Sequence, residues 1–186
     1  MLSRPLPAAL FLLAALVLAA AVILAWTRAA RDRANLITDG AGWIWFTLDI
    51  GERRPIHFYA SRRFRLSGVP RTARAKLFVD PRGALSINGR RFPSVEQRPG
   101  SFLAVLEVAP VLVEGENRVV IEAESPSGAG GILFCLDLPG GQRLVSDSSW
   151  RVALSEPPAT QEDRAAGTWG RPPMYPWGYP KIQPAP

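Results

Sequence analysis

The chain has 186 residues, of which 47% are hydrophobic, and this length suffices for one domain with accessory segments. Its formal net charge is +6, but residues 1–33 carry four of the 22 basic and one of the 16 acidic residues. The remainder, with 18 basic against 15 acidic residues, is too nearly balanced for a nucleic-acid-binding surface. We therefore expect no nucleic-acid partner. The single cysteine, Cys135, cannot form an internal disulfide, and its apolar neighbours predict a buried core residue.

The N-terminal segment is the most apolar part of the chain. From Leu6 to Trp26 it contains no charged residue, and about 20 helical residues cross a hydrocarbon core of roughly 30 Å. We therefore predict an uncleaved membrane anchor over residues 1–30. A cleaved signal peptide is the main alternative, but it has a shorter apolar region and a small-residue cleavage site, whereas Arg28 and Arg31 follow here. A buried helix of a soluble protein is the third interpretation.

Charge and domain type argue for opposite orientations of this anchor. Arg4 precedes the apolar run, whereas Arg28, Arg31 and Arg33 follow it. The positive-inside rule would then place the C-terminal domain in the cytoplasm. The domain described below is of a type that belongs outside. We expect a single-pass protein of the cell membrane with its domain periplasmic or extracellular, and the opposite orientation stays open.

Residues 31–40 form a short stalk ending in the turn signal Asp39-Gly40, and residues 41–155 alternate between short apolar strands and turn residues. The hairpin signal Asn88-Gly89 is the strongest of these turns. This pattern predicts an all-β fold, an antiparallel sandwich or barrel. The strand candidates are 43–50, 55–66, 73–80, 85–87, 102–108, 118–123, 132–138, 143–145 and 150–154.

The last segment, residues 156–186, is rich in proline and yet contains aromatic residues. A purely disordered tail is usually poor in aromatics. We predict an extended docking element whose rings insert either into a partner or into the sandwich itself, and both alternatives stay open. The candidate partner-binding residues are Trp169, Tyr175, Trp177 and Tyr179.

Several motifs resemble galactose-binding-like β-sandwich domains. The segment from Ala75 to Gly89 looks like the strand and hairpin of that group, and Gly115-Glu116-Asn117 is similar to its step into the next strand. The early Trp43-Ile44-Trp45 and the late Ser146-Asp147 with Trp150 resemble the sandwich that precedes the catalytic barrel of bacterial α-L-rhamnosidases. The resemblance covers residues 40–155 and implies a jelly-roll accessory module, often carbohydrate-associated. The hydrolytic activity of that family resides in a separate helical barrel that these residues do not resemble.

The sequence gives little support for catalysis. Glu122 and Glu124 are candidate paired carboxylates, but alternation makes a solvated strand face the simpler interpretation. His57 is the only histidine, which excludes a multi-histidine metal site. No glycine-rich phosphate loop is present. We expect no enzyme activity, no cofactor and no metal, and a structural calcium stays an open question.

Candidate ligand-binding residues are Trp43, Trp45 and Trp150, whose rings could cover the apolar face of a sugar, and Arg62 and Arg63, which could bind an acidic ligand. Burial in the core is the alternative for the tryptophans, and a charged edge strand for the arginines. Because side chains alternate along a strand, Trp43 and Trp45 are expected on one face. We predict a non-catalytic, membrane-anchored envelope module that binds carbohydrate or a partner protein. The alternative is a structural subunit of a membrane complex with the tail as docking element.

Overall fold

The computed structural model describes residues 6–49, 54–156 and 163–183, and within the first helix it describes side chains for residues 10–29 and 37–38. Two compact units result, Met1–Arg33 and Ala34–Pro186. Helix α1 runs over Leu6–Thr38 and includes most of the predicted stalk. The chain then turns through Asp39 (φ 55°) and Gly40 (φ 81°), as the sequence predicts.

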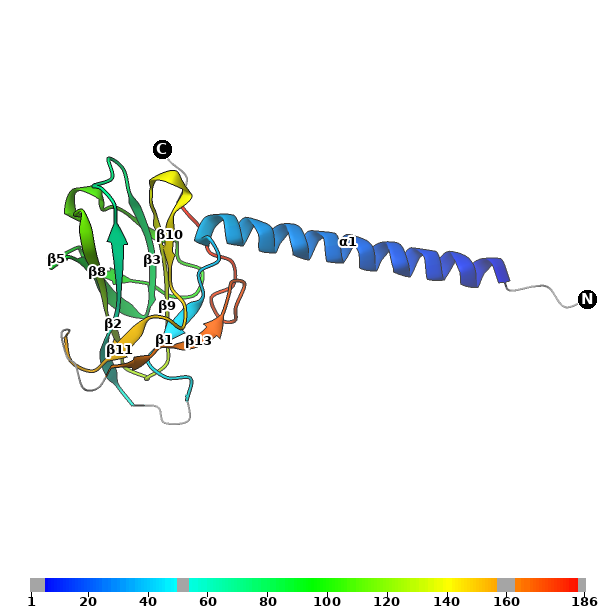
Figure 1. Cartoon of the computed structure of the whole chain (residues 1–186). Helices are drawn as coiled ribbons and strands as arrows, with labels where there is room; N and C mark the ends of the chain where they lie inside the picture. Colours follow the sequence, from blue (N-terminus) through cyan, green and yellow to red (C-terminus); the bar gives the residue numbers. More distant parts are fainter. Residues whose placement is uncertain (1–5, 50–53, 157–162, 184–186) are drawn as a thin grey trace, which may run out of the picture. The chain divides into compact units, whose positions relative to one another are not determined.

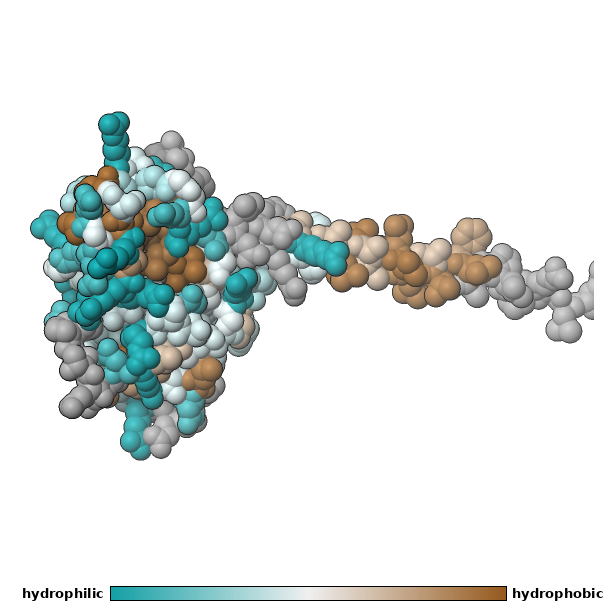
Figure 2. Space-filling view, in the orientation of Figure 1, coloured by the Kyte–Doolittle hydropathy of each residue, from teal (hydrophilic) through white to brown (hydrophobic). Residues whose placement is uncertain are grey.

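The stretch Leu10–Ala29 of α1 has the length and apolar composition of a membrane span. No other helix among the described residues has both properties. Figure 2 shows the apolar side chains of this stretch, none of which is buried within the structure. A signal sequence near an N-terminus also passes this test of length and composition. The predicted apolar N-terminal helix is therefore confirmed, whereas its anchoring in a membrane is taken up below as a proposal.

The second unit is an antiparallel β-sandwich, which confirms the predicted fold class (Figure 1). One sheet, here sheet A, has the strand order β13-β1-β9-β3-β7, with β10 also paired to β9. The other, sheet B, has the order β12-β11-β2-β8-β4-β5, with β6 also paired to β4. The strands are β1 Trp43–Trp45, β2 Ile56–Leu66, β3 Arg74–Asp80, β4 Arg82–Ile87, β5 Arg90–Arg91, β6 Val95–Glu96, β7 Ala104–Glu107, β8 Gly115–Ser125, β9 Gly131–Asp137, β10 Arg143–Val145, β11 Arg151–Ala153, β12 Arg164–Ala165 and β13 Gly167–Gly170, with short 3₁₀ turns at Ala109–Val111 and Pro139–Gly141.

The main core lies between the two sheets and follows the alternation of the strands. In β3 the side chains of Ala75, Leu77 and Val79 are buried in it, as the alternating pattern predicts. Strand β8 contributes Val119 and Ile121 from the facing sheet. Burying each large aliphatic side chain of this kind stabilises the domain by about 1.5–3 kcal/mol.

The outer face of sheet A carries a second apolar cluster. Phe78 of β3 and Leu133 of β9 point to this face and pack with Trp43. An apolar outer face must be covered, and the covering element is the C-terminal strap, residues 163–183. The strap pairs with β1 through β13 at one edge of the sheet, and beside the other edge the Leu103 amide donates to the Lys181 carbonyl at 2.8 Å.

The expectation that Trp43 and Trp45 share one face is wrong. Trp43 belongs to the outer cluster, whereas Trp45 packs edge-on against Phe58 in the main core. The pairing of β1 with β13 shifts register between Trp43 and Ile44. Such an irregularity breaks the two-residue period that the expectation assumed.

Candidate functional site

A hollow of about 410 Å³ opens where the strap meets two loops of the sandwich. One wall is the chain between β3 and β4, and another is the loop that joins β8 to β9. The strap supplies the aromatic side. The lining residues are Asp80, Pro81, Ser127, Ala129, Gly130, Trp169, Tyr175, Pro176 and Trp177.

Two adjacent glycines let tryptophan rings pack directly on the backbone at this place. A Cβ on Gly131 would lie 2.5 Å from Cζ2 of Trp177, and one on Gly130 would lie 2.6 Å from Cη2 of Trp45. Atoms this close clash, so any larger residue at either position displaces a ring. The pair Gly130-Gly131 therefore allows Trp177 to lie flat against the start of β9.

Indole hydrogen bonds fix the loops around the hollow. Trp177 Nε1 donates to Asp80 Oδ2 at 2.6 Å, and Trp169 Nε1 donates to the Gly130 carbonyl at 3.2 Å. Trp45 Nε1 donates to the Gly128 carbonyl at 2.8 Å from the core side. Trp177 also stacks on Trp43, with ring centroids 4.3 Å apart and planes 21° apart. Both the floor and one wall of the hollow are thus held in place by the sandwich.

Asp80 is the acidic group of the hollow. Burial raises the pKa of its carboxyl group, and the hydrogen bond from Trp177 opposes part of this rise. Among the described residues, only Oδ2 of Asp80 is engaged, so Oδ1 is available to accept a hydrogen bond. A half-buried carboxylate acceptor beside aromatic rings is suited to binding hydroxyl donors.

Tyr175 is the exposed aromatic residue of the hollow. Its side chain is 91% exposed, whereas Trp177 is 8% exposed and Trp169 is intermediate. Tyrosine offers a large apolar surface with a polar tip, so this ring is open to contact with a ligand. The hollow therefore combines an apolar platform, an apolar floor and a carboxylate acceptor.

The structure places the candidate ligand-binding tryptophans in the interior. Trp43 is 1% exposed, and Trp45 and Trp150 are fully buried. Trp150 packs against Phe134 and donates its Nε1 hydrogen to the Val145 carbonyl at 2.9 Å. These three rings expose no face to solvent in this conformation, and none of them lines the hollow.

The two candidate arginines lie on β2 of sheet B, outside the hollow. Arg62 donates to the Ser149 carbonyl at 2.7 Å, and Arg63 forms an exposed ion pair with Glu116 at 3.6 Å. Of the four aromatic residues singled out in the tail, Trp169, Tyr175 and Trp177 come together at the hollow, whereas Tyr179 lies outside it. Asp80 and the Gly130-Gly131 pair were not recognised from the sequence, although the Asp-Pro and Gly-Gly turn signals mark both places.

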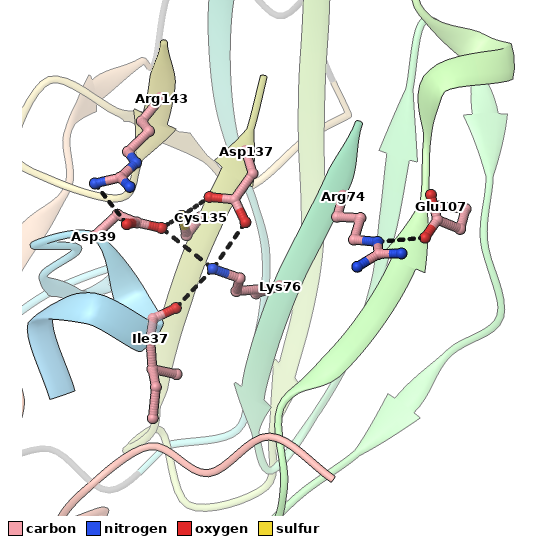
Figure 3. Close-up of polar contacts among 8 residues, drawn as sticks. All are labelled: Ile37, Asp39, Arg74, Lys76, Glu107, Cys135, Asp137 and Arg143. Atoms are coloured by element: carbon pink, nitrogen blue, oxygen red, sulfur yellow. Dashed lines mark hydrogen bonds and ion pairs between the residues drawn. The ribbon is translucent and has the colours of Figure 1, made fainter. Parts of the chain in front are cut away.

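A buried ion cluster lies where α1 ends in the second unit (Figure 3). Lys76 Nζ donates to the Ile37 carbonyl at 2.9 Å and forms ion pairs with Asp39 at 3.2 Å and Asp137 at 2.8 Å. Arg143 approaches the other oxygen of Asp39 at 2.7 Å. Burial alone would raise the pKa of Asp137, but the hydrogen bond and charge of Lys76, together with hydrogen bonds to Asp39 and Cys135, outweigh this effect and lower it. The ammonium group takes the place that a cation would need, so this cluster fastens the end of α1 to the sandwich.

A second polar cluster lies on the outer face of sheet B. His57 Nε2 lies 2.8 Å from Glu122 Oε1, and Glu124 approaches both residues closely enough for the three to share an ion. Arg91 also forms an ion pair with Glu122, and together with His57 it lowers the pKa of this carboxyl group despite partial burial. The carboxylate is therefore already neutralised by protein groups, and we assign it to the packing of the strand face.

Comparison with known proteins places the fold. Neither a protein-family model nor a curated protein matches the sequence. Among solved structures, the chain is similar to an α-L-rhamnosidase of Streptomyces avermitilis in complex with L-rhamnose, at 22% identity and TM-score 0.62, covering 76% of this chain and 16% of that one. A lectin of Pleurotus ostreatus in complex with GalNAc matches at 20% identity and TM-score 0.65, covering 78% of this chain and 46% of the lectin. The domain therefore has the fold of a galactose-binding-like β-sandwich.

A rhamnosidase of Bacillus sp. GL1 matches similarly, at 18% identity and TM-score 0.65, over 76% of this chain and 19% of that enzyme. The galactose-binding-like resemblance drawn from the sequence is thus confirmed for the fold. The chain spans less than half the length of each of these proteins. Their activities and ligands belong to larger molecules and enter only as support for the proposal below.

Proposed function

We propose that the protein is a non-catalytic carbohydrate-binding module that is held at a membrane by α1. The observation that carries the proposal is the hollow, in which the exposed ring of Tyr175 faces solvent beside the carboxylate of Asp80. A sugar ring has an apolar face of C–H groups and an edge of hydroxyl donors. Aromatic surface with a few placed polar groups is the general composition of small-ligand sites.

The lining of the hollow favours binding over hydrolysis. Glycoside hydrolysis requires two carboxyl groups about 5–10 Å apart, and Asp80 is the only acidic residue among those that line the hollow. The free Oδ1 of Asp80 would accept sugar hydroxyls, and Ser127 would add a hydroxyl group. Sugar complexes of two structurally similar proteins support this choice of ligand class.

The binding test uses full-length protein in a detergent without a sugar headgroup. Wild-type protein is titrated with L-rhamnose, galactose, N-acetylgalactosamine, glucose and mannose up to millimolar concentration. We expect at least one to bind, and both Tyr175→Ala and Asp80→Asn to weaken it by about 2 kcal/mol, roughly thirtyfold in Kd, as for contact hot spots and charged hydrogen bonds. Tyr179→Ala is the matched control, because Tyr179 is a partly exposed tyrosine of the strap outside the hollow. Failure of every sugar, or equal loss in the control, would contradict the proposal.

The membrane part of the proposal places the domain outside the cytoplasm, where a tethered site of modest affinity acts at high local concentration. The stretch Leu10–Ala29 supports an anchor. The intact mass of the membrane-extracted protein should include residues 1–30, and protease added to intact spheroplasts should digest the domain. A mature protein that lacks the helix would contradict the anchor, and a domain protected until lysis would contradict the orientation.

A protein partner is the second candidate occupant of the strap. It is favoured by Tyr179, which is 44% exposed although it plays no part in the hollow. A docking partner would bury this ring as well as Tyr175. Co-purification in mild detergent decides between the two candidates. A stoichiometric protein that is lost in Tyr179→Ala supports a docking partner at the strap. A co-purifying protein that remains bound in both Tyr175→Ala and Tyr179→Ala contradicts it.

A further inference from the structure

A second hollow adjoins the first at the Asp80-Pro81 segment. This second hollow, of about 510 Å³, is lined by Asp80, Pro81, Glu96, Gln97, Arg98 and Ser101. The two hollows share Asp80 and Pro81 and so adjoin along this segment. A ligand that fills the first and extends past Asp80 enters the second.

We infer that the second hollow is a subsite for the next unit of an uncharged oligosaccharide whose first unit occupies the aromatic hollow. This inference rests on the proposed function and names its ligand class. The second hollow contains no aromatic residue and instead offers carboxylate, guanidinium, amide and hydroxyl groups. Such a lining suits a hydroxyl-rich unit that remains partly hydrated.

The subsite is formed in advance by one buried side chain. Gln97 accepts a hydrogen bond from the Val79 amide at 2.8 Å and donates to the Phe102 carbonyl at 2.6 Å. Its own backbone amide donates to the Pro81 carbonyl at 2.9 Å. These three bonds tie the segment after β6 to β3 and to the Asp80-Pro81 segment, so little ordering remains to be done on binding.

Two exposed side chains of the subsite have free polar groups. Among the described residues, neither the guanidinium of Arg98 nor the carboxylate of Glu96 takes part in a hydrogen bond or ion pair, although both residues are exposed. Beyond Arg98, the Ser101 amide donates to the Arg98 carbonyl at 2.9 Å and closes a tight turn. Arg98 can donate to, and Glu96 can accept from, the hydroxyls of a second sugar unit.

The balance of charge selects neutral ligands. Asp80 and Glu96 place two carboxylates along the path, against the single guanidinium of Arg98. A uronic acid or sulfated unit would face net repulsion there, because like charges in a partly desolvated site are unfavourable. The inferred ligand is therefore a neutral disaccharide or longer glycan.

The test measures chain-length dependence on the full-length protein. The probes are the methyl glycosides of L-rhamnose, galactose, N-acetylgalactosamine, glucose and mannose, disaccharides that carry each of these at the non-reducing end, and matching disaccharides with a uronic acid as the second unit. We expect the neutral disaccharide of the bound sugar to bind at least tenfold more tightly than its methyl glycoside, and the acidic one to show no such gain. Arg98→Ala with Glu96→Gln should remove the gain and leave the affinity for the methyl glycoside unchanged. Arg90→Ala, an exposed arginine of β5 outside both hollows, is the control and should change neither.

The outcomes separate this inference from the proposed function. Binding of a methyl glycoside with no gain from the second unit overturns the subsite and leaves the carbohydrate-binding function standing. A gain that survives in the double variant, or a larger gain for the acidic disaccharide, also overturns it. Absence of binding by every probe overturns the proposed function and the subsite together.

Discussion

Removal of the Trp177 side chain should detach the strap from the sandwich. Trp177 is 8% exposed, stacks on Trp43 at 4.3 Å and donates to Asp80 at 2.6 Å. Truncation of a buried tryptophan to alanine lowers the free energy of unfolding by about 3–5 kcal/mol. Loss of a stacked aromatic pair accounts for about 0.5–1.5 kcal/mol of that decrease. We therefore expect Trp177→Ala to lower the free energy of unfolding by about 4 kcal/mol, a large share of the usual 5–15 kcal/mol.

The assay is urea unfolding of full-length protein in mild detergent, followed by the fluorescence of the remaining tryptophans. Tyr175→Ala is the matched control, because its side chain is 91% exposed and its loss should change stability by no more than about 0.5 kcal/mol. The two variants should therefore differ in stability while both lose sugar binding. A cost below about 1 kcal/mol for Trp177→Ala would refute the argument that the strap is part of the folded domain.

Three further predictions concern the residues around the strap and the end of α1. Sugar affinity should fall as the pH is lowered through the raised pKa of Asp80, since protonation removes the charged acceptor, and the affinity of Asp80→Asn should stay level over the same titration. Stability should change in the other direction with pH. Because the folded-state pKa of Asp80 is raised, its contribution to the free energy of unfolding is present at low pH and is lost as the pH rises through that pKa. Gly131→Ala should displace the Trp177 ring, which would otherwise lie 2.5 Å from the new Cβ. We expect it to lower the free energy of unfolding in urea by about 1–3 kcal/mol and to abolish sugar binding. Lys76→Met should cost about 3 kcal/mol in the same assay, because among the described residues it leaves the buried carboxylate of Asp39 with the exposed Arg143 as its one cationic partner, beside the hydrogen bond from the Cys135 thiol.

Local pattern was sufficient to predict most of the sandwich. The alternation of Ala75, Leu77 and Val79 assigned both the strand and its buried face, because each of these residues contributes to the same core. Residues 132–138 do not alternate and were predicted as a strand because the run is nearly all apolar, and β9 is accordingly buried on both faces. The predicted strand over 43–50 was too long, since among its described residues, 43–49, only Trp43–Trp45 form a strand.

The site depended on contacts that no local pattern contains. Aromatic residues among prolines marked the strap as a docking element, but Trp177 and its acceptor Asp80 lie 97 positions apart in the sequence. The register shift that turns Trp43 toward the strap arises from pairing with β13, a strand within the same tail. Asp80 becomes part of a hollow only because the strap crosses sheet A and brings Trp177 beside it, which no pattern around Asp80 predicts.

Indole resonances offer the most direct measurement of the central claim, that the aromatic hollow binds sugar. In full-length protein labelled with ¹⁵N at tryptophan, the Nε1–H groups of Trp169 and Trp177 lie at the hollow, and that of Trp150 bonds to Val145 in the interior. On titration with the sugar found by the binding panel, we predict saturable shifts of the Trp169 and Trp177 resonances with an unchanged Trp150 resonance, and loss of these shifts in Tyr175→Ala. Saturable binding that leaves Trp169 and Trp177 unmoved would show that the sugar binds elsewhere and would contradict the account.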